Sequence, residues 1–204
     1  MKEWLYDWGG LNVALFHAIN ANHAPWLDAL MQALTWVGDH NRFEYYLAAL
    51  ALATWWQYSR EPDSASTRAW LLALATFSFG YVLDGWLVIG LKSAFEFPRP
   101  PAVFSPNELI VVGTPEFHHS FPSGHASFAT LVAASLWPVV SRRALHALLV
   151  IVVVGVCLSR PYLGFHFPAD VLFGSLKTLL LAVVIRHLLV RFNREPFSYR
   201  SGIK

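Results

Sequence analysis

Long apolar stretches alternate with short polar segments along most of the chain. About 20 consecutive, mostly apolar residues are needed for a helix to cross the roughly 30 Å hydrocarbon core of a bilayer. Four stretches approach or reach this length, and a fifth, residues 144–159, is shorter but free of charge. We therefore predict membrane-spanning helices at residues 43–58, 69–91, 126–140, 144–159 and 171–190.

The N-terminal part of the chain has a weaker pattern. Residues 25–37 carry apolar side chains at helical spacing, but such a helix covers only about 20 Å at 1.5 Å per residue. This segment is either a short tilted span or a helix at the membrane surface. Residues 11–19, separated from it by Asn20, Asn22 and Pro25, are expected to form an interfacial helix. The whole pattern predicts an all-α integral membrane bundle of about six transmembrane helices with an N-terminal amphipathic helix.

The composition of the chain supports a place in the membrane. Hydrophobic residues make up 55%, the mean hydropathy is +0.43, and 14% of residues are charged, against about 25% in typical soluble domains. The net charge is +2 without a basic stripe, so nucleic acid is not an expected partner. No repeat divides the chain, and residues 1–204 are predicted to form one domain with a motif-bearing core at about 69–190.

Basic residues outside the candidate site predict the orientation of the bundle. Short cytoplasmic loops are enriched in Lys and Arg, and alternating spans place three basic groups on the same side. The opposite side, with segments 92–123 and 160–170, is expected to face the periplasm or cell exterior of a bacterial inner membrane. The basic groups assigned to the cytoplasm are Arg60 and Arg68, Arg142 and Arg143, and Arg191, Arg194, Arg200 and Lys204.

Polar segments on the expected outer side contain residues suited to phosphoryl transfer. This reaction needs neutralised phosphate oxygens, a nucleophile in line and an acid for the leaving oxygen. Lys92, Arg99 and Arg160 supply positive charge on the side where basic residues are otherwise scarce. Ser123 and the backbone N–H of Gly124 add donors at the start of a helix. These residues are predicted to bind phosphate.

Two histidines and an aspartate complete the predicted chemistry. If a helix begins near Pro168, Asp170 lies about one turn into it and can orient the imidazole of His166. The other ring nitrogen is then nucleophilic. His125 lies beside the phosphate-binding residues, where it can protonate the leaving oxygen and later activate water. We predict that His166 is the nucleophile, His125 the acid and base, and Asp170 the residue that orients the nucleophile.

The polar segments resemble the signature of the type 2 phosphatidic-acid phosphatase superfamily. Its motifs K-x6-R-P, P-S-G-H and S-R-x5-H-x3-D occur here in order. The resemblance implies a bundle of six transmembrane helices, a catalytic centre near the outer membrane surface, and no metal ion or other cofactor. It also implies the same roles for the histidines and cations. The matching positions are Lys92, Arg99, Pro100, Pro122, Ser123, Gly124, His125, Ser159, Arg160, His166 and Asp170.

The leading functional hypothesis is hydrolysis of a phosphomonoester or pyrophosphate on a lipid, through a phosphohistidine. A lipid substrate keeps its tail in the bilayer while its headgroup reaches a site near the surface. Undecaprenyl pyrophosphate and phosphatidylglycerophosphate rank first, and lipid A 1-phosphate ranks next. Two alternatives stay open: transfer of the phosphate to another lipid and, more remotely, a lipid transporter with charges along its path. The sequence does not indicate an oligomeric state.

Several polar residues have no assigned role. Asp84 and Lys177 lie inside predicted spans, where an unpaired charge is unfavourable, so each is expected to face the bundle interior or find a partner. His118 and His119, in the same loop as Glu108 and Glu116, are candidates for contact with the substrate headgroup. The remaining histidines, which lack a motif context, are His17, His23, His40, His146 and His187.

Overall fold

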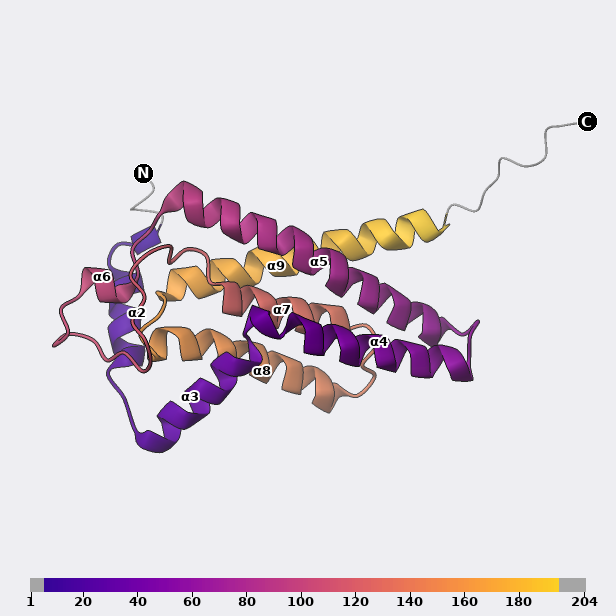
Figure 1. Cartoon of the computed structure of the whole chain (residues 1–204), viewed down its shortest axis with the longest axis horizontal. Helices are drawn as coiled ribbons and strands as arrows, with labels where there is room; N and C mark the ends of the chain where they lie inside the picture. The colour runs from indigo at the N-terminus through magenta and orange to yellow at the C-terminus, as the bar shows by residue number, and fades with distance from the viewer. Residues whose placement is uncertain (1–5, 195–204) are drawn as a thin grey trace, which may run out of the picture.

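The protein is described by a computed structural model that covers residues 6–194. In this range the regular elements are all helical, as predicted, and no strand occurs among them (Figure 1). They are α2 (Leu11–Asn20), α3 (Pro25–Val37), the 3₁₀ turn η1 (His40–Arg42), α4 (Phe43–Arg60), α5 (Ala65–Phe95), α6 (Pro100–Val103), α7 (Gly124–Leu136), α8 (Arg143–Tyr162) and α9 (Pro168–Arg194).

Helix length and composition identify the clearest membrane spans. Within the described chain, three helical segments are long and apolar enough to cross a bilayer: Ala65–Val103, Arg143–Tyr162 and Pro168–Phe192. α3 and α7 have 13 residues each, whereas α4 has 18 residues but is more polar. The count of six transmembrane helices therefore stays a prediction. Arg200 and Lys204, which contributed to the predicted orientation, lie outside the described residues.

The long helices form a bundle in which α7 is central. α4, α5, α7, α8 and α9 run lengthwise, while α2 and α6 lie at one end (Figure 1). α7 contacts α5, α8 and α9. Its first half contains the small buried side chains of Ala126, Ser127 and Ala129, which allow neighbouring helices to approach closely. A short helix can therefore serve as the support on which the longer ones pack.

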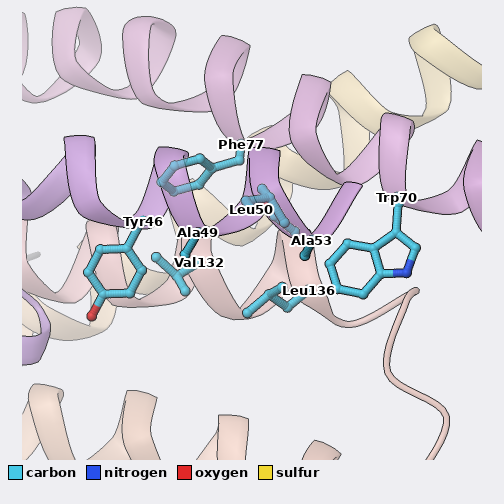
Figure 2. A pocket seen from close by; sticks show the side chains of 9 residues that line it. Tyr46, Ala49, Leu50, Ala53, Trp70, Phe77, Val132 and Leu136 are labelled. Atoms are coloured by element: carbon cyan, nitrogen blue, oxygen red, sulfur yellow. The ribbon is translucent and has the colours of Figure 1, made fainter. Parts of the chain in front are cut away.

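The main hydrophobic core lies between α4, α5 and α7. Leu50, Phe77 and Leu131 are buried there and pack with neighbours on each helix. Gly80 permits the close approach of α5 and α7, because a Cβ at this position would lie 2.5 Å from a Leu131 methyl carbon. Figure 2 shows Leu50 and Phe77 beside Val132 around a small apolar cavity of about 170 Å³. This core holds α4 against the rest of the bundle.

The outward faces of α5, α8 and α9 carry many exposed large apolar side chains. Soluble monomers rarely expose continuous apolar surfaces, whereas helices that contact lipid do so along their length. These faces therefore suit direct contact with the bilayer. The exposed side chains include Phe79, Trp86, Ile89, Ile151, Val154, Leu176, Leu180 and Val183.

α7 is shorter than the apolar stretch from which it was predicted. The stretch reaches residue 140, but the helix ends at Leu136. Pro138 has no backbone N–H to continue the helical hydrogen bonds, and Val139 and Val140 instead both donate to the Leu136 carbonyl. The other predicted spans lie within longer helices, because polar residues at their ends are also helical.

Candidate active site

The predicted site residues come together at the bundle end that carries α2 and α6 (Figure 1). Lys92 lies in the last turn of α5, and Arg160 lies in the last turn of α8. His125 is in the first turn of α7, and Asp170 is in the first turn of α9. His166 lies in the connection between α8 and α9. Helix ends thus bring distant parts of the sequence to one place.

A cavity of about 670 Å³ opens between these helix ends and continues along α5. Its polar part is lined by the three predicted cations, both predicted histidines and Gly124. From there it passes Val88 and Ile89 of α5, and Phe128 and Leu131 of α7 contribute to its wall. The cavity therefore joins a cationic end to a mostly apolar channel, which Asp84 of α5 also lines.

Asp170 is fully buried and is surrounded by hydrogen-bond donors. Its Oδ2 lies 3.3 Å from Nδ1 of His166. The same oxygen accepts hydrogen bonds from the Ser120 hydroxyl at 2.6 Å and the Phe167 backbone N–H at 2.8 Å. Oδ1 accepts a hydrogen bond from the Tyr6 hydroxyl at 2.7 Å. A carboxylate beside Nδ1 favours the tautomer with the proton on that nitrogen, which leaves a lone pair on Nε2.

The Nε2 atom of His166 points to the cationic end of the cavity. The residue is only 2% exposed, and Nη1 of Arg99 lies 3.4 Å from Nε2. Burial is the main cause that lowers the pKa of His166 well below its ordinary value, and the charges of Arg99, Arg160 and Lys92 lower it further. The imidazole is therefore neutral, which is the form that can act as a nucleophile.

Arg99 is held on several sides at the mouth of this site. It donates from Nε to the His118 carbonyl at 2.9 Å and from Nη1 to the Phe165 carbonyl at 3.3 Å. Its Nη2 forms an ion pair with Glu116 at 2.7 Å. The Glu116 side chain is 55% exposed, so its carboxylate occupies a solvent-accessible position at which a phosphate oxygen would compete for the guanidinium.

Lys92 and Arg160 complete the positive surface of the cavity. Lys92 donates to the backbone carbonyl of His119. Arg160 donates from Nη1 to the Thr35 hydroxyl, and its guanidinium carbon lies 4.6 Å from the centroid of the Phe165 ring. Its Nε is buried and has no hydrogen-bond partner among the described residues. Cations held by neutral groups keep their charge available for an anion with several oxygens.

The start of α7 lies against the same cavity. Gly124 lines the cavity, whereas Ser123 is fully buried and caps the helix by accepting a hydrogen bond from the Ala126 N–H at 3.5 Å. Ser123 was predicted to bind phosphate; its hydroxyl caps α7, and its contact with phosphate stays a prediction. His125 lines the cavity, and its ring lies nearly perpendicular to that of His40 at a centroid distance of 6.2 Å.

Comparison with known proteins places this arrangement in a family. Residues 68–194, more than half of the chain, match the PAP2 superfamily. The chain belongs to the PAP2 superfamily. The resemblance carried by the three sequence motifs is thereby confirmed, and the protein is a membrane lipid phosphate hydrolase of the PAP2 type.

Relatives of known structure share the PAP2 fold. The crystal structure of LpxE from Aquifex aeolicus superposes with a TM-score of 0.68 at 24% identity, covering 86% of this chain and 94% of that one. The crystal structure of the first transmembrane PAP2-type phosphatidylglycerolphosphate phosphatase from Bacillus subtilis also superposes with a TM-score of 0.68. The two sequences are 23% identical, and the match covers 92% of this chain and 89% of that one. In sequence, an undecaprenyl-diphosphatase of Sulfolobus acidocaldarius is 29% identical over 167 residues, which cover 82% of this chain and 73% of the relative.

Three contacts of the PAP2 site were not predicted from the sequence. Ser120 and Tyr6 both donate to Asp170, and Thr35 accepts from Arg160. Ser120 lies just before the P-S-G-H motif, and this proximity was a usable signal. Tyr6 and Thr35 lie far from every motif, and nothing in their local sequence indicates that they reach the site.

Asparagines of α2 attach the N-terminal part of the chain to the PAP2 core. Oδ1 of Asn12 accepts a hydrogen bond from the Ala169 N–H at 2.9 Å. The Asn20 amide donates to the carbonyls of Ile110 and Tyr162, each at 2.8 Å, and its Oδ1 accepts from the Ile110 N–H at 2.8 Å. One face of α2 thus fixes the end of α8, the start of α9 and the loop that precedes α7.

The polar residues without an assigned role also have defined contacts. Nζ of Lys177 lies 2.6 Å from Oδ1 of Asp84, which also accepts a hydrogen bond from the Thr178 hydroxyl at 2.6 Å. The expectation that these charges find partners inside the bundle is confirmed. His118 and His119 contact the site cations through their backbone carbonyls, and headgroup contact by their rings stays a prediction.

Proposed function

We propose that this PAP2 protein removes phosphate from a lipid phosphomonoester or pyrophosphate at the outer face of the membrane. The observation that carries the proposal is one cavity that contains His166, three cations and an apolar channel along α5. A substrate with a phosphate headgroup and a long apolar tail matches both parts. Undecaprenyl pyrophosphate and phosphatidylglycerophosphate are the first candidates, supported by the named activities of the Sulfolobus and Bacillus relatives, and lipid A 1-phosphate is next.

In the first step, Nε2 of His166 attacks phosphorus. A P–N bond forms while the bond from phosphorus to its leaving oxygen breaks. His125 binds a proton together with the anionic substrate, whose charge favours the protonated ring, and donates that proton to the leaving oxygen. Arg99, Arg160 and Lys92 neutralise the remaining phosphate oxygens. The lipid leaves as an alcohol, or as a monophosphate when the substrate is a pyrophosphate.

In the second step, water attacks the phosphohistidine. His125, now neutral, takes a proton from the water as its oxygen bonds to phosphorus. The P–N bond breaks, its electron pair returns to Nε2 of His166, and inorganic phosphate leaves. Asp170 acts through His166, because it holds the Nδ1 proton and stabilises the positive charge that the ring carries while it is phosphorylated.

Replacing the nucleophile tests this mechanism. The purified protein, in detergent with EDTA, is offered a panel of the three candidate lipids. We expect the parent to release phosphate and His166→Ala to lose about a thousandfold or more in kcat. His187→Ala, which removes an exposed imidazole of α9 outside the cavity, is the matched control and should retain parent activity. Equal phosphate release by His166→Ala would rule out the proposed nucleophile.

The same panel addresses the metal ion and the fate of the phosphate. Among the described residues, no group of three or more His, Cys, Asp or Glu side chains is arranged to hold a metal ion. We expect EDTA to leave the rate unchanged, and a rate restored only by added metal would refute metal-independent catalysis. With a labelled terminal phosphate, free label indicates hydrolysis, whereas label on a second lipid would show transfer.

A further inference from the structure

A second groove lies at the end of the bundle opposite the active site, between α7, α8 and α9. Its volume is about 580 Å³, and its wall is almost entirely apolar. The small side chains of Ala133 and Ala182 leave space between the helices, and Val150 and Val154 line the groove from α8. Figure 1 shows α8 and α9 diverging toward this end. The groove has the size and lining of a site for a hydrophobic ligand.

Arg186 gives this groove a charge. Among the described residues that line the groove, Arg186 alone is charged. Its Nη1 is buried, and its guanidinium forms no hydrogen bond or ion pair with any residue in the described part of the chain. Lys177, earlier on the same helix, is instead paired with Asp84 at 2.6 Å. Arg186 is half-buried, and its unpaired Nη1 beside apolar side chains favours a ligand that carries an anionic group.

The position of Arg186 along α9 matches the level of lipid headgroups. At 1.5 Å per residue, Arg186 lies about 27 Å from Pro168 along the helix axis. Pro168 is at the active-site end, and the hydrocarbon core is roughly 30 Å thick, so Arg186 lies near the headgroups of the opposite leaflet. Trp137 also lines the groove and packs on His146 with ring centroids 4.3 Å apart, and tryptophan is typical of this interfacial level.

We propose that this groove binds one anionic phospholipid from the leaflet opposite the active site. The lipid phosphate accepts hydrogen bonds from Arg186, and an acyl chain lies between α8 and α9 against Val153 and Leu179. Among the described residues that line the groove, Arg186 can bind a phosphate, but none carries a carboxylate that could bind an ammonium group. An anionic headgroup is therefore preferred over a zwitterionic one. The bound lipid joins α8 to α9 at the end where the two helices diverge.

Lipid titration of the full-length protein tests the proposal. The protein is delipidated in neutral detergent, and inorganic phosphate is added to occupy the active site. Phosphatidylglycerol or phosphatidylcholine is then added, and the lipid molecules that the protein retains are counted by native mass spectrometry. We expect one retained phosphatidylglycerol, bound at least about tenfold more tightly than phosphatidylcholine. Arg186→Gln should weaken its binding by about tenfold or more. Arg191→Gln removes an exposed positive charge near the same end of α9 and should leave binding unchanged.

A second pair of variants tests the groove itself. Val150→Trp fills the groove and should abolish retention of the lipid. Leu180, on α9 outside the groove, is 66% exposed, and Leu180→Trp should leave retention of the lipid unchanged. Phosphate release by each variant reports that it is folded. Equal binding of the two lipids, or full retention by Arg186→Gln or Val150→Trp, overturns the proposal. A detergent-stable dimer that Val150→Trp dissociates would assign the groove to a second copy of the chain and also overturn it.

Discussion

The carboxylate of Asp170 receives hydrogen bonds from separate parts of the chain. The hydroxyls of Tyr6 and Ser120 and the backbone N–H of Phe167 all donate to it. Each of these donors stabilises the charged form, and together they prevent the carboxylate from turning away from His166. The orientation of the imidazole thus depends on neutral residues that would not be recognised as part of a catalytic site by residue type alone.

The buried imidazole of His166 predicts a pH dependence of stability. Burial lowers its pKa in the folded protein, whereas the unfolded chain binds a proton near the ordinary value of 6.5. Between the folded and unfolded pKa values the imidazole is protonated in the unfolded state alone, so the contribution of His166 to stability falls as pH decreases below about 6.5, by up to about 1.4 kcal/mol per pH unit. Above that pH the stabilising contribution of the neutral ring is fully present.

Thermal unfolding in phosphate-free buffer between about pH 5 and 8 measures this effect. His166→Phe keeps a buried aromatic ring but cannot bind a proton, so its Tm should decrease less than that of the parent on acidification. His187→Phe, at an exposed position on α9, should follow the parent. Parallel pH profiles for the parent and His166→Phe would contradict the prediction.

The sequence indicated which residues gather at the candidate site better than it indicated the contacts that hold them. Residue type and spacing were sufficient to select His166 and Lys92, because phosphoryl transfer requires a nucleophile and cations. Ser123 was selected by the same reasoning, but its cap of α7 was not among the contacts predicted for the site. The Tyr6 contact joins positions 164 residues apart, and a single long-range hydrogen bond leaves no periodic pattern in a sequence.

At the level of helices, α7 and α9 are in backbone contact beside the active site. A Cβ on Gly174 would lie 2.8 Å from the Ser123 carbonyl oxygen, a distance that requires the helices to shift. The Ser123 N–H donates to the Asp170 carbonyl at 3.1 Å, so the same contact ties the cap of α7 to the first turn of α9. The spacing of these helices therefore affects the position of Asp170.

Adding one methyl group at this contact tests its importance. We expect Gly174→Ala to separate α7 from α9, to reduce stability by about 1–3 kcal/mol and to lower kcat through displacement of Asp170. Gly90→Ala, in α5, is the matched control because its Cβ would meet nothing within 4 Å. Its higher helix propensity should leave stability equal or slightly increased. A Gly174→Ala protein with parent Tm and kcat would disprove the close contact.

The length of the apolar stretches located the long helices, because each helix exposes a continuous apolar surface to lipid or buries it against its neighbours. It did not locate their ends. Polar residues extend α5 to Ala65 and Phe95, while Pro138 ends α7 before the apolar stretch does. Helix boundaries depend on hydrogen-bond continuity as well as on apolarity, and the two properties change at different residues.

At the level of the whole molecule, the site is produced by the alternation of helix directions. The motifs lie at the ends of α5 and α8 and at the starts of α7 and α9, so opposite chain directions bring all of them to one end of the bundle. This placement could be predicted, because it requires only the order of spans and motifs. The closure of the site by the N-terminal segment could not, because α2 carries no motif.

Cysteine labelling in intact bacterial cells tests the proposed outward orientation. In a Cys157→Ser background, Asn107→Cys lies in an exposed loop at the active-site end, and Asp63→Cys lies in an exposed loop between α4 and α5. We expect a membrane-impermeant maleimide to label Asn107→Cys before lysis and Asp63→Cys only after lysis, since basic loops favour the cytoplasm. The opposite labelling pattern would place the active site on the cytoplasmic side.

The contacts of Tyr6 with Asp170 and of Asn12 with Ala169 have a consequence for biosynthesis. Chains emerge from the ribosome with the N-terminal part first, so these two residues wait for partners that lie 164 and 157 residues further along the chain. In an unfinished chain these polar groups lack their hydrogen-bond partners, and the active site cannot form. Phosphatase activity is therefore expected only after the start of α9 has been made and has joined the N-terminal segment.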